Sequence, residues 1–360
     1  MKRIIFLDWL RIFSFSSVLI GHKFYPILLG FSNDDSVHES LRFLIKLILP
    51  LCFAGGAGVV VFFLVSGYVI THVLQTEQPL EFLVKRIFRI YPLYIFAVLL
   101  QYSLLYSAHP GIINLQIIIP QLLLVGDFFQ TPYSLSGVEW TLRVEVLFYL
   151  FMFTLRYFKI IGQYEYALPG VLAIAALIIG NLPTTPHAEY LAIGYLNIYG
   201  PFLFLGAFFW MYENKKVSFA QMSLFTGFIF IQHWHLIATI NPGWRHVHFA
   251  GLAFLIFLAV WTARDKLFFN RLILFISELT YSVYLMHNWL FDHIKQWTIA
   301  GGLFQHNRYA LIMLIAICAV LVKAIEKPGI KLGRVLIRRL KTTTPSYYTG
   351  AEEALINAKY

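Results

Sequence analysis

Two ionisable side chains in the first long apolar segment, Arg11 and His22, have the types and spacing of a functional site. A charged or ionisable side chain inside a membrane-spanning helix is costly, so it marks a functional site by default. Eleven positions are close to three helical turns, about 16 Å of rise, so both side chains point the same way. Asp8, three residues before Arg11, shares that face. An imidazole at such depth can serve as a general base. The alternative is a structural Asp8–Arg11 ion pair with His22 as a packing residue.

A second candidate is Glu145, in the stretch EWTLRVEVLFY that opens another apolar segment. A carboxyl group about two turns inside such a segment needs a partner or a proton. Arg143 is only two residues away, which places the two side chains on different faces of a helix. We therefore predict a catalytic or orienting role for Glu145, while Arg143 could touch substrate or only perturb Glu145.

The stretch KRIFRIYP precedes a further apolar segment and carries Arg86 and Arg89 three residues apart. On a helix this spacing could hold a phosphate by planar, bidentate contacts. The same cations could equally be signals that keep the loop on the cytoplasmic side.

Ser66-Gly67 lies in the middle of an apolar segment and allows close approach, either by another helix or by a ligand. His287, in LTYSVYLMHN, could line the same cavity as His22 or only bond to another helix. The histidine pairs 233/235 and 246/248 favour a polar, aromatic rim over a metal site, because residues two apart on a helix face apart and no Cys or acid joins them.

The composition is that of a protein with many membrane-spanning helices. The chain has 360 residues, of which 59% are hydrophobic and only 13% charged. A soluble domain of this size carries more charge. The formal net charge is +10. We attribute this excess to cytoplasmic loops beside anionic lipid and expect no nucleic-acid partner.

The apolar segments predict an all-α fold of about ten transmembrane helices. The predicted spans are 5–27, 57–75, 90–107, 138–158, 166–181, 190–212, 217–240, 247–263, 271–293 and 307–327. Most Lys and Arg residues then fall inside if both termini are cytoplasmic. If the segment 114–130 crossed the membrane completely, all later loops would change sides and most Lys and Arg residues would no longer be cytoplasmic. The segment could instead dip into the membrane without crossing it. We expect one transmembrane domain over residues 1–330 and a basic cytoplasmic tail over 331–360 with a mobile end, acting as a membrane-surface anchor.

Taken in order, the segments from Leu7 to about Pro328 resemble the membrane-bound acyltransferase family 3, the O-acyltransferases of cell-surface glycans. The resemblance is carried by LDWLR, the Arg11-x10-His22 spacing, GVVVFFLVSGYVIT, KRIFRIYPLY, EWTLRVEVLFYL and LTYSVYLMHNWL. Each motif is weak alone, and the ordered set is specific.

The resemblance implies roles for individual residues. His22 matches the family's essential histidine and Arg11 its basic partner, whereas Arg86 and Arg89 match the motif linked to acyl-donor use. Glu145 matches the acid of a W-S-L-x-x-E segment that has Thr in place of Ser here, and Arg143 where a small residue is usual. We accordingly predict the following sites: catalytic His22 and Glu145; donor-binding Arg11, Arg86 and Arg89; substrate-binding Asp8, Ser66, Trp140, Tyr281 and His287; and no metal.

The implied reaction is transfer of an acyl group, which we expect to be acetyl, from cytoplasmic acetyl-CoA or another acyl-CoA. The acceptor would be a hydroxyl of an envelope glycan or a lipid-linked saccharide, and the protein a multi-pass protein of the bacterial inner membrane in contact with its lipids. His22 would act as general base, oriented or stabilised by Glu145, although an acyl-enzyme stays open. A solute exporter is the alternative. The sequence determines neither the acceptor nor the oligomeric state.

Overall fold

The computed structural model describes residues 3–108, 114–186, 193–300 and 307–343, and within these ranges it contains helices and no strand. The all-α prediction is thus confirmed for this part of the chain. The α-helices are α1 (Ile5–Lys23), α2 (Tyr25–Asn33), α3 (Glu39–Cys52), α4 (Gly56–Val73), α5 (Pro79–Ala108), α6 (Leu115–Leu122), α7 (Glu139–Tyr157), α8 (Leu168–Asn181), α9 (Tyr195–Tyr199), α10 (Pro201–Glu213), α11 (Phe219–Ile240), α12 (Phe249–Thr262), α13 (Arg271–Met286), α14 (Trp289–Ala300), α15 (Asn307–Leu321) and α16 (Lys327–Thr343). Short turns of other helix types are η1 (Phe53–Gly55), η2 (Gly126–Phe129), η3 (Glu165–Ala167), η4 (Pro242–Trp244) and the π-helical η5 (Val322–Glu326).

Each of the ten predicted spans contains a helix. Within the described residues, four helical stretches are both long and apolar enough to cross a membrane: Ile5–Lys23, Glu39–Val73, Phe219–Ile240 and Asn307–Leu340. The other segments are short, as α12 is with 14 residues, or carry charges, as α7 does. The number of ten spans and the cytoplasmic side of both termini stay predictions.

The segment 114–130 is too short to cross the bilayer as a helix. Its only α-helix, α6, has eight residues and rises about 12 Å, well below the roughly 30 Å of the hydrocarbon core. Leu124 and Gln130 have positive φ angles and interrupt any continuation toward or beyond η2. Of the two predicted alternatives, the structure therefore favours a dipping segment.

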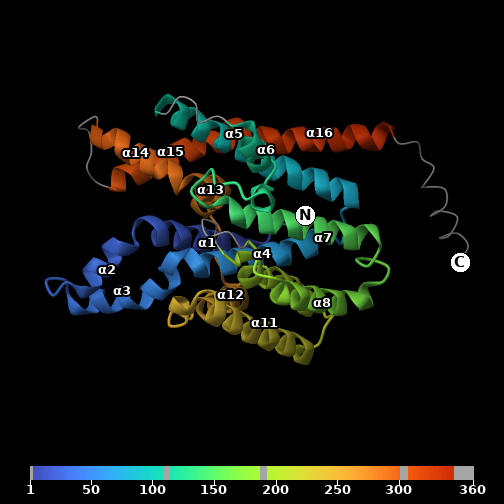
Figure 1. Ribbon diagram of the computed structural model, residues 1–360. Coiled ribbons are helices and arrows are strands. Elements are labelled where there is room, and N and C mark those ends of the chain that lie inside the picture. Colours follow the sequence, from blue (N-terminus) through green and yellow to red (C-terminus); the bar gives the residue numbers. More distant parts are fainter. Residues whose placement is uncertain (1–2, 109–113, 187–192, 301–306, 344–360) are drawn as a thin grey trace, which may run out of the picture.

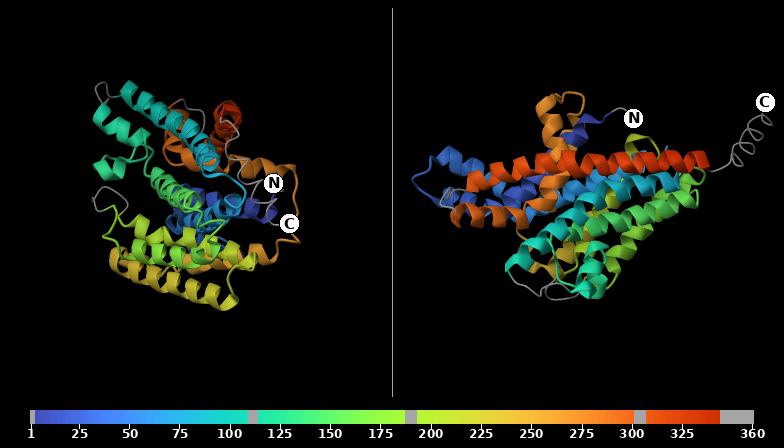
Figure 2. Two further views of the ribbon diagram at one scale, coloured as in Figure 1. Left: turned by 90° about the vertical axis from the view of Figure 1, so that its right-hand side faces the viewer. Right: turned by 90° about the horizontal axis from the view of Figure 1, so that it is seen from above.

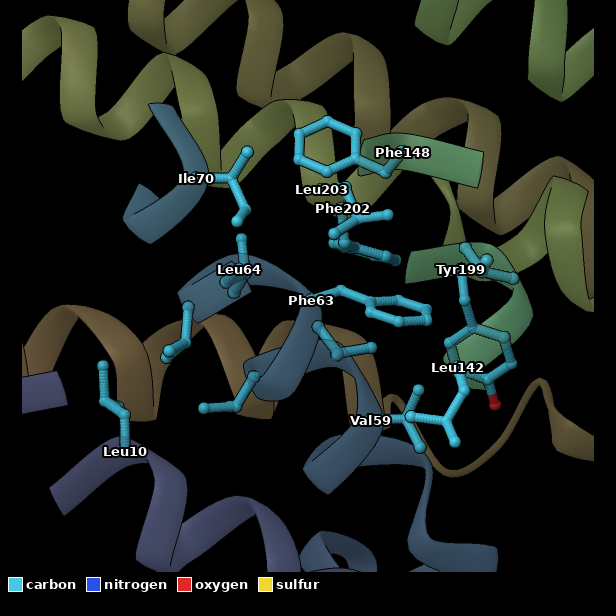
Figure 3. Packing of buried hydrophobic residues seen from close by; sticks show 14 of the residues in the cluster. Leu10, Val59, Phe63, Leu64, Ile70, Leu142, Phe148, Tyr199, Phe202 and Leu203 are labelled. Carbon is cyan, nitrogen blue, oxygen red and sulfur yellow. The ribbon is translucent and has the colours of Figure 1, made fainter. Parts of the chain in front are cut away.

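Helix α4 is the centre of the fold. It contacts α10, α1, α12, α3 and α7. A Cβ atom at Gly67 would collide with the Leu203 carbonyl of α10, and one at Gly58 with the Ser14 carbonyl of α1. Gly67 is thus needed for helix packing. Figure 3 shows Phe63 of α4 among Phe202 and Leu203 of α10.

The other helices surround this centre in two groups. Figure 1 shows α5 and α16 side by side along one edge of the molecule, and α8, α11 and α12 at the opposite edge. Helices α2 and α3 form a hairpin at one end, and α3 continues through η1 into α4 (Figures 1 and 2). Residue 330, the predicted end of the transmembrane domain, lies inside α16, and 344–360 lie outside the described residues.

Candidate active site

Three cavities lie next to one another between the helices. The basic cavity has a volume of about 870 Å³ and includes Arg3, Arg11, Arg89, Lys331, Arg334 and Arg338 in its wall. The middle cavity, about 100 Å³, includes Arg11, Ser66, Arg86, Arg89 and Glu145. The aromatic cavity, about 360 Å³, includes His22, Tyr133, Trp140, Tyr195, Tyr199 and Trp244.

Shared walls connect the three cavities in that order. The basic and middle cavities have Arg11, Arg89 and Tyr281 in common. The middle and aromatic cavities have Val59 and Tyr284 in common. Figure 3 shows Val59 of α4 next to Leu142 of α7 and Tyr199 at this second boundary. Arg11 and His22, on one helix, thus belong to the first and the last cavity of the series.

His22 contacts a second histidine, His287, which is distant in the sequence. Its Nδ1 lies 2.8 Å from Nε2 of His287, and the two rings stack with centroids 5.0 Å apart. Nδ1 of His287 lies 2.6 Å from the carbonyl oxygen of Tyr284. His287 is 1% exposed, whereas His22 is exposed in the aromatic cavity.

These contacts determine which nitrogen of His22 can take a proton. The Tyr284 carbonyl only accepts hydrogen bonds, so Nδ1 of His287 must donate and its Nε2 is an acceptor in the neutral ring. Nδ1 of His22 then donates to that Nε2. The proton-accepting nitrogen of His22 is therefore Nε2.

Glu145 belongs to the middle cavity and has other partners. Its Oε1 accepts hydrogen bonds from Ser66 Oγ at 2.9 Å and from Tyr149 at 2.5 Å. The side chain is 7% exposed. The structure does not bring Glu145 to His22, because the first lines the middle cavity and the second the aromatic one. The predicted partnership of these two residues is replaced by the His22–His287 pair.

The cations at the other end of the series are arranged around Asp8. This aspartate accepts bonds from Arg3 at 2.7 and 2.9 Å and from Ser277 at 2.7 Å. Arg11 is 3.4 Å away, so the predicted Asp8–Arg11 pair exists but is the longer of two. Arg3 was not predicted, because next to Lys2 it resembles an ordinary topology signal. Asp8 is 1% exposed and contacts both arginines.

Arg86 and Arg89 have different surroundings. Arg86 lies over the Phe82 ring and has its Nη2 3.8 Å from a carboxylate oxygen of Glu77. Arg89 lines both the basic and the middle cavity, and no carboxylate of the described residues lies within 4.0 Å of it. Arg89 is the better placed of the two to receive a phosphate.

The remaining predicted residues line the cavities or hold their walls. Trp140 contacts Tyr195 and Tyr199 at ring distances of 4.8 and 5.2 Å in the aromatic cavity. Tyr281 donates to the Ile90 carbonyl at 2.8 Å and lines the first two cavities. Among the residues that the structure describes, no three His, Cys, Asp or Glu side chains gather as a metal site would require.

Arg143 has a structural partner outside the cavities. Its guanidinium lies 2.5 Å from Asp127 and donates at 2.7 Å to the Leu124 carbonyl, and both charged side chains are 4% exposed. Tyr195 also donates to Asp127. Arg143 thus links the segment 114–130 to α7. Its charge pairs with Asp127 and not with Glu145.

Removing one member of this buried pair should destabilise the protein. We expect Arg143→Met to cost about 3–5 kcal/mol, because it leaves the Asp127 carboxylate buried and uncompensated. Thermal unfolding in detergent measures the loss. The double variant Arg143→Met/Asp127→Leu should recover most of it, and a double variant as unstable as the single one would contradict this assignment.

These features define a class of protein. It is a helical, membrane-type protein in which a passage joins a basic cavity to an aromatic cavity that contains a histidine. The sequence model of the family described as "Acyltransferase domain" matches residues 4–325. The chain therefore belongs to the acyltransferase 3 family. This finding gives no support to a solute exporter.

Two relatives agree with this assignment. The chain is 26% identical over 272 residues to "Nodulation protein 10" of Rhizobium leguminosarum bv. viciae, covering 68% of the chain and 65% of that protein. It is 23% identical over 256 residues to "Putative acetyltransferase ORF330" of Acidianus two-tailed virus, covering 67% of the chain and 75% of the relative. The chain thus spans slightly less than two thirds of the nodulation protein. No solved structure matches.

Proposed function

We propose that this protein is an integral-membrane O-acyltransferase that moves an acyl group, acetyl in the first instance, from cytoplasmic acyl-CoA to a hydroxyl of an envelope glycan or its lipid-linked precursor. The observation that carries the proposal is the series of three cavities, with an excess of cations at one end and the exposed His22 at the other. The name of the viral relative supports an acetyl donor.

Each cavity suits one part of the reactants. The phosphates of the donor nucleotide belong beside Arg11 and Arg89, since arginine binds phosphate by charge-assisted hydrogen bonds. The narrow middle cavity admits the slender pantetheine arm. Glu145, whose Oε1 already holds Ser66 and Tyr149, offers Oε2 to an amide N–H of that arm. The acceptor enters the aromatic cavity, because rings with a few polar groups are typical of small-ligand sites.

In the transfer step His22 acts as general base. Nε2 takes the proton of the acceptor hydroxyl while its oxygen attacks the thioester carbonyl carbon. The new C–O bond forms, the C–S bond breaks, and the proton passes from His22 to the leaving CoA sulfur. His287 holds the other nitrogen of His22 throughout, and a direct transfer of this kind needs no acyl-enzyme.

Labelled acetyl-CoA tests this function. Membranes that contain the protein should leave label covalently on a glycan fraction, and membranes without it should not. Mass spectrometry of envelope glycans from a deletion strain then identifies the acceptor. Protein-dependent labelling of no glycan, with either acetyl-CoA or succinyl-CoA, would contradict the proposal.

Arg89 should control the affinity for the donor. Arg89→Gln removes a charge that faces both the basic and the middle cavity, so we expect the KM for acyl-CoA to rise about tenfold or more, as the loss of a charged hydrogen bond of roughly 1.5–3 kcal/mol implies. The kcat at saturating donor should change little. Initial rates over a range of acyl-CoA concentrations measure both constants, with Lys159→Gln as a cationic control outside the cavities. An unchanged KM would contradict this role.

A further inference from the structure

The last described helix, α16, begins after the segment that matches the acyltransferase family, which ends at residue 325. It is nevertheless fixed to the body of the protein. Gly329 and Gly333 lie against Pro92 and Phe88 of α5, where added Cβ atoms would be too close. Figure 1 shows α16 running alongside α5. This helix is therefore an integral part of the edge that contains Arg89.

One face of α16 is cationic and borders the basic cavity. Lys331, Arg334 and Arg338 follow one another at intervals of three and four residues, which puts them on the same face. All three are exposed and line the cavity together with Arg11 and Arg89. Within the described residues, none of the three lies within 4.0 Å of a carboxylate.

Seven Lys and Arg residues and three acids line this cavity. Asp8 is bonded to Arg3 and Glu278 to Lys327 at 2.8 Å, whereas Glu326 is 7% exposed and has no cation within 4.0 Å among the described residues. The cations outnumber the acids, so the cavity carries an excess of positive charge. Such a charge attracts polyanions and raises their local concentration.

Three leucines of α16 lie on the opposite face. Leu332, Leu336 and Leu340 are 59, 38 and 39% exposed and recur every four residues. They suit contact with lipid chains, whereas the cations point toward the cavity. This arrangement favours a ligand inside the protein over the membrane-surface anchor predicted from the sequence.

We propose that Lys331, Arg334 and Arg338 of α16 bind the phosphate groups of the acyl-CoA nucleotide, so that this helix completes the donor site. The inference rests on the proposed function. A volume of about 870 Å³ lies within the range of small-molecule and cofactor sites. Three further cations beside Arg11 and Arg89 match the several phosphate charges of the nucleotide.

Equilibrium binding of labelled CoA to the full-length protein in lipid nanodiscs tests the proposal. The variant Arg334→Gln/Arg338→Gln is compared with Lys323→Gln/Arg339→Gln, which also removes two charges, one from η5 and one from α16, at positions that do not line the cavity. We expect the Kd for CoA to rise about tenfold or more in the first variant and less than about twofold in the second, because only the first loses phosphate contacts. Binding of pantetheine, which lacks the nucleotide, should change in neither.

The possible results distinguish nucleotide binding by α16 from lipid binding, and a failure of this inference from a failure of the proposed function. Nanodiscs of neutral and of anionic lipid should give the same effect, and an effect confined to anionic lipid would assign these cations to lipid headgroups and overturn the proposal. Equal shifts in both variants, or none, would also overturn it. If the wild-type protein binds CoA and transfers acyl groups but the cavity variant binds like wild type, this inference alone fails. If the wild type binds no CoA, the proposed function fails first. The single variant Arg338→Gln, with an expected smaller rise in Kd, serves if the double variant does not fold.

Discussion

Replacing His22 with alanine is expected to abolish acyl transfer while the protein remains in the membrane and still binds its donor. A general base contributes about 10²–10⁴-fold to a rate, and no other described side chain in the aromatic cavity has a histidine's ability to take a proton near neutral pH. Donor binding should survive because the cations lie in the basic cavity, two cavities away.

Labelled acetyl-CoA and membranes with equal amounts of each variant measure this effect. His246→Ala is the matched control, since it removes a histidine that lines none of the three cavities. Normal acylation of glycans by the His22→Ala protein would refute the role of His22. Loss of donor binding in the same variant would show that the cavities do not separate the two functions.

Replacing His287 with leucine is expected to lower kcat by about 10²-fold or more, because the partner that fixes the tautomer of His22 is lost. Without an acceptor at 2.8 Å from Nδ1, that nitrogen no longer holds its proton in place, and Nε2 is no longer kept free to accept one. His287 is a positioning residue, since it is 1% exposed behind His22.

A conservative variant separates this role from simple packing. The amide oxygen of glutamine can accept from His22 and its NH₂ can donate to the Tyr284 carbonyl, so His287→Gln should recover much of the activity. In both variants the KM for acyl-CoA should stay near the wild-type value. Equal loss of activity in the Leu and Gln variants, with equally lowered melting temperatures, would assign His287 to packing alone.

The sequence identified the side chains of the site better than their partners. Arg11, His22 and Glu145 stood out because a charged or ionisable group is costly in an apolar segment. Their contacts could not be derived in the same way. His22 and His287 are 265 positions apart, and only the packing of α1 against α13 brings them together. The sequence left His287 undecided between two roles, and the structure gives it the one across helices.

Sequence neighbourhood was a poor guide to the contacts of Arg143 and of α16. Arg143 is two positions from Glu145, yet its charge is engaged by Asp127 of the dipping segment. The basic residues after position 330 were predicted to contact the membrane surface, because a run of Lys and Arg near a chain end favours that reading. Gly329 and Gly333 were the overlooked signal, since small residues four apart allow close contact between helices.

The central claim is that an acyl group from a cytoplasmic donor reaches a hydroxyl held at His22 through the protein. Sealed membrane vesicles and labelled acetyl-CoA, which does not cross the bilayer, test it most directly. Inverted vesicles, which expose the cytoplasmic face, should transfer label to glycan with wild-type protein and not with His22→Ala, and sealed right-side-out vesicles should transfer none. Equal labelling in both orientations, or labelling by the His22→Ala protein, would contradict the account.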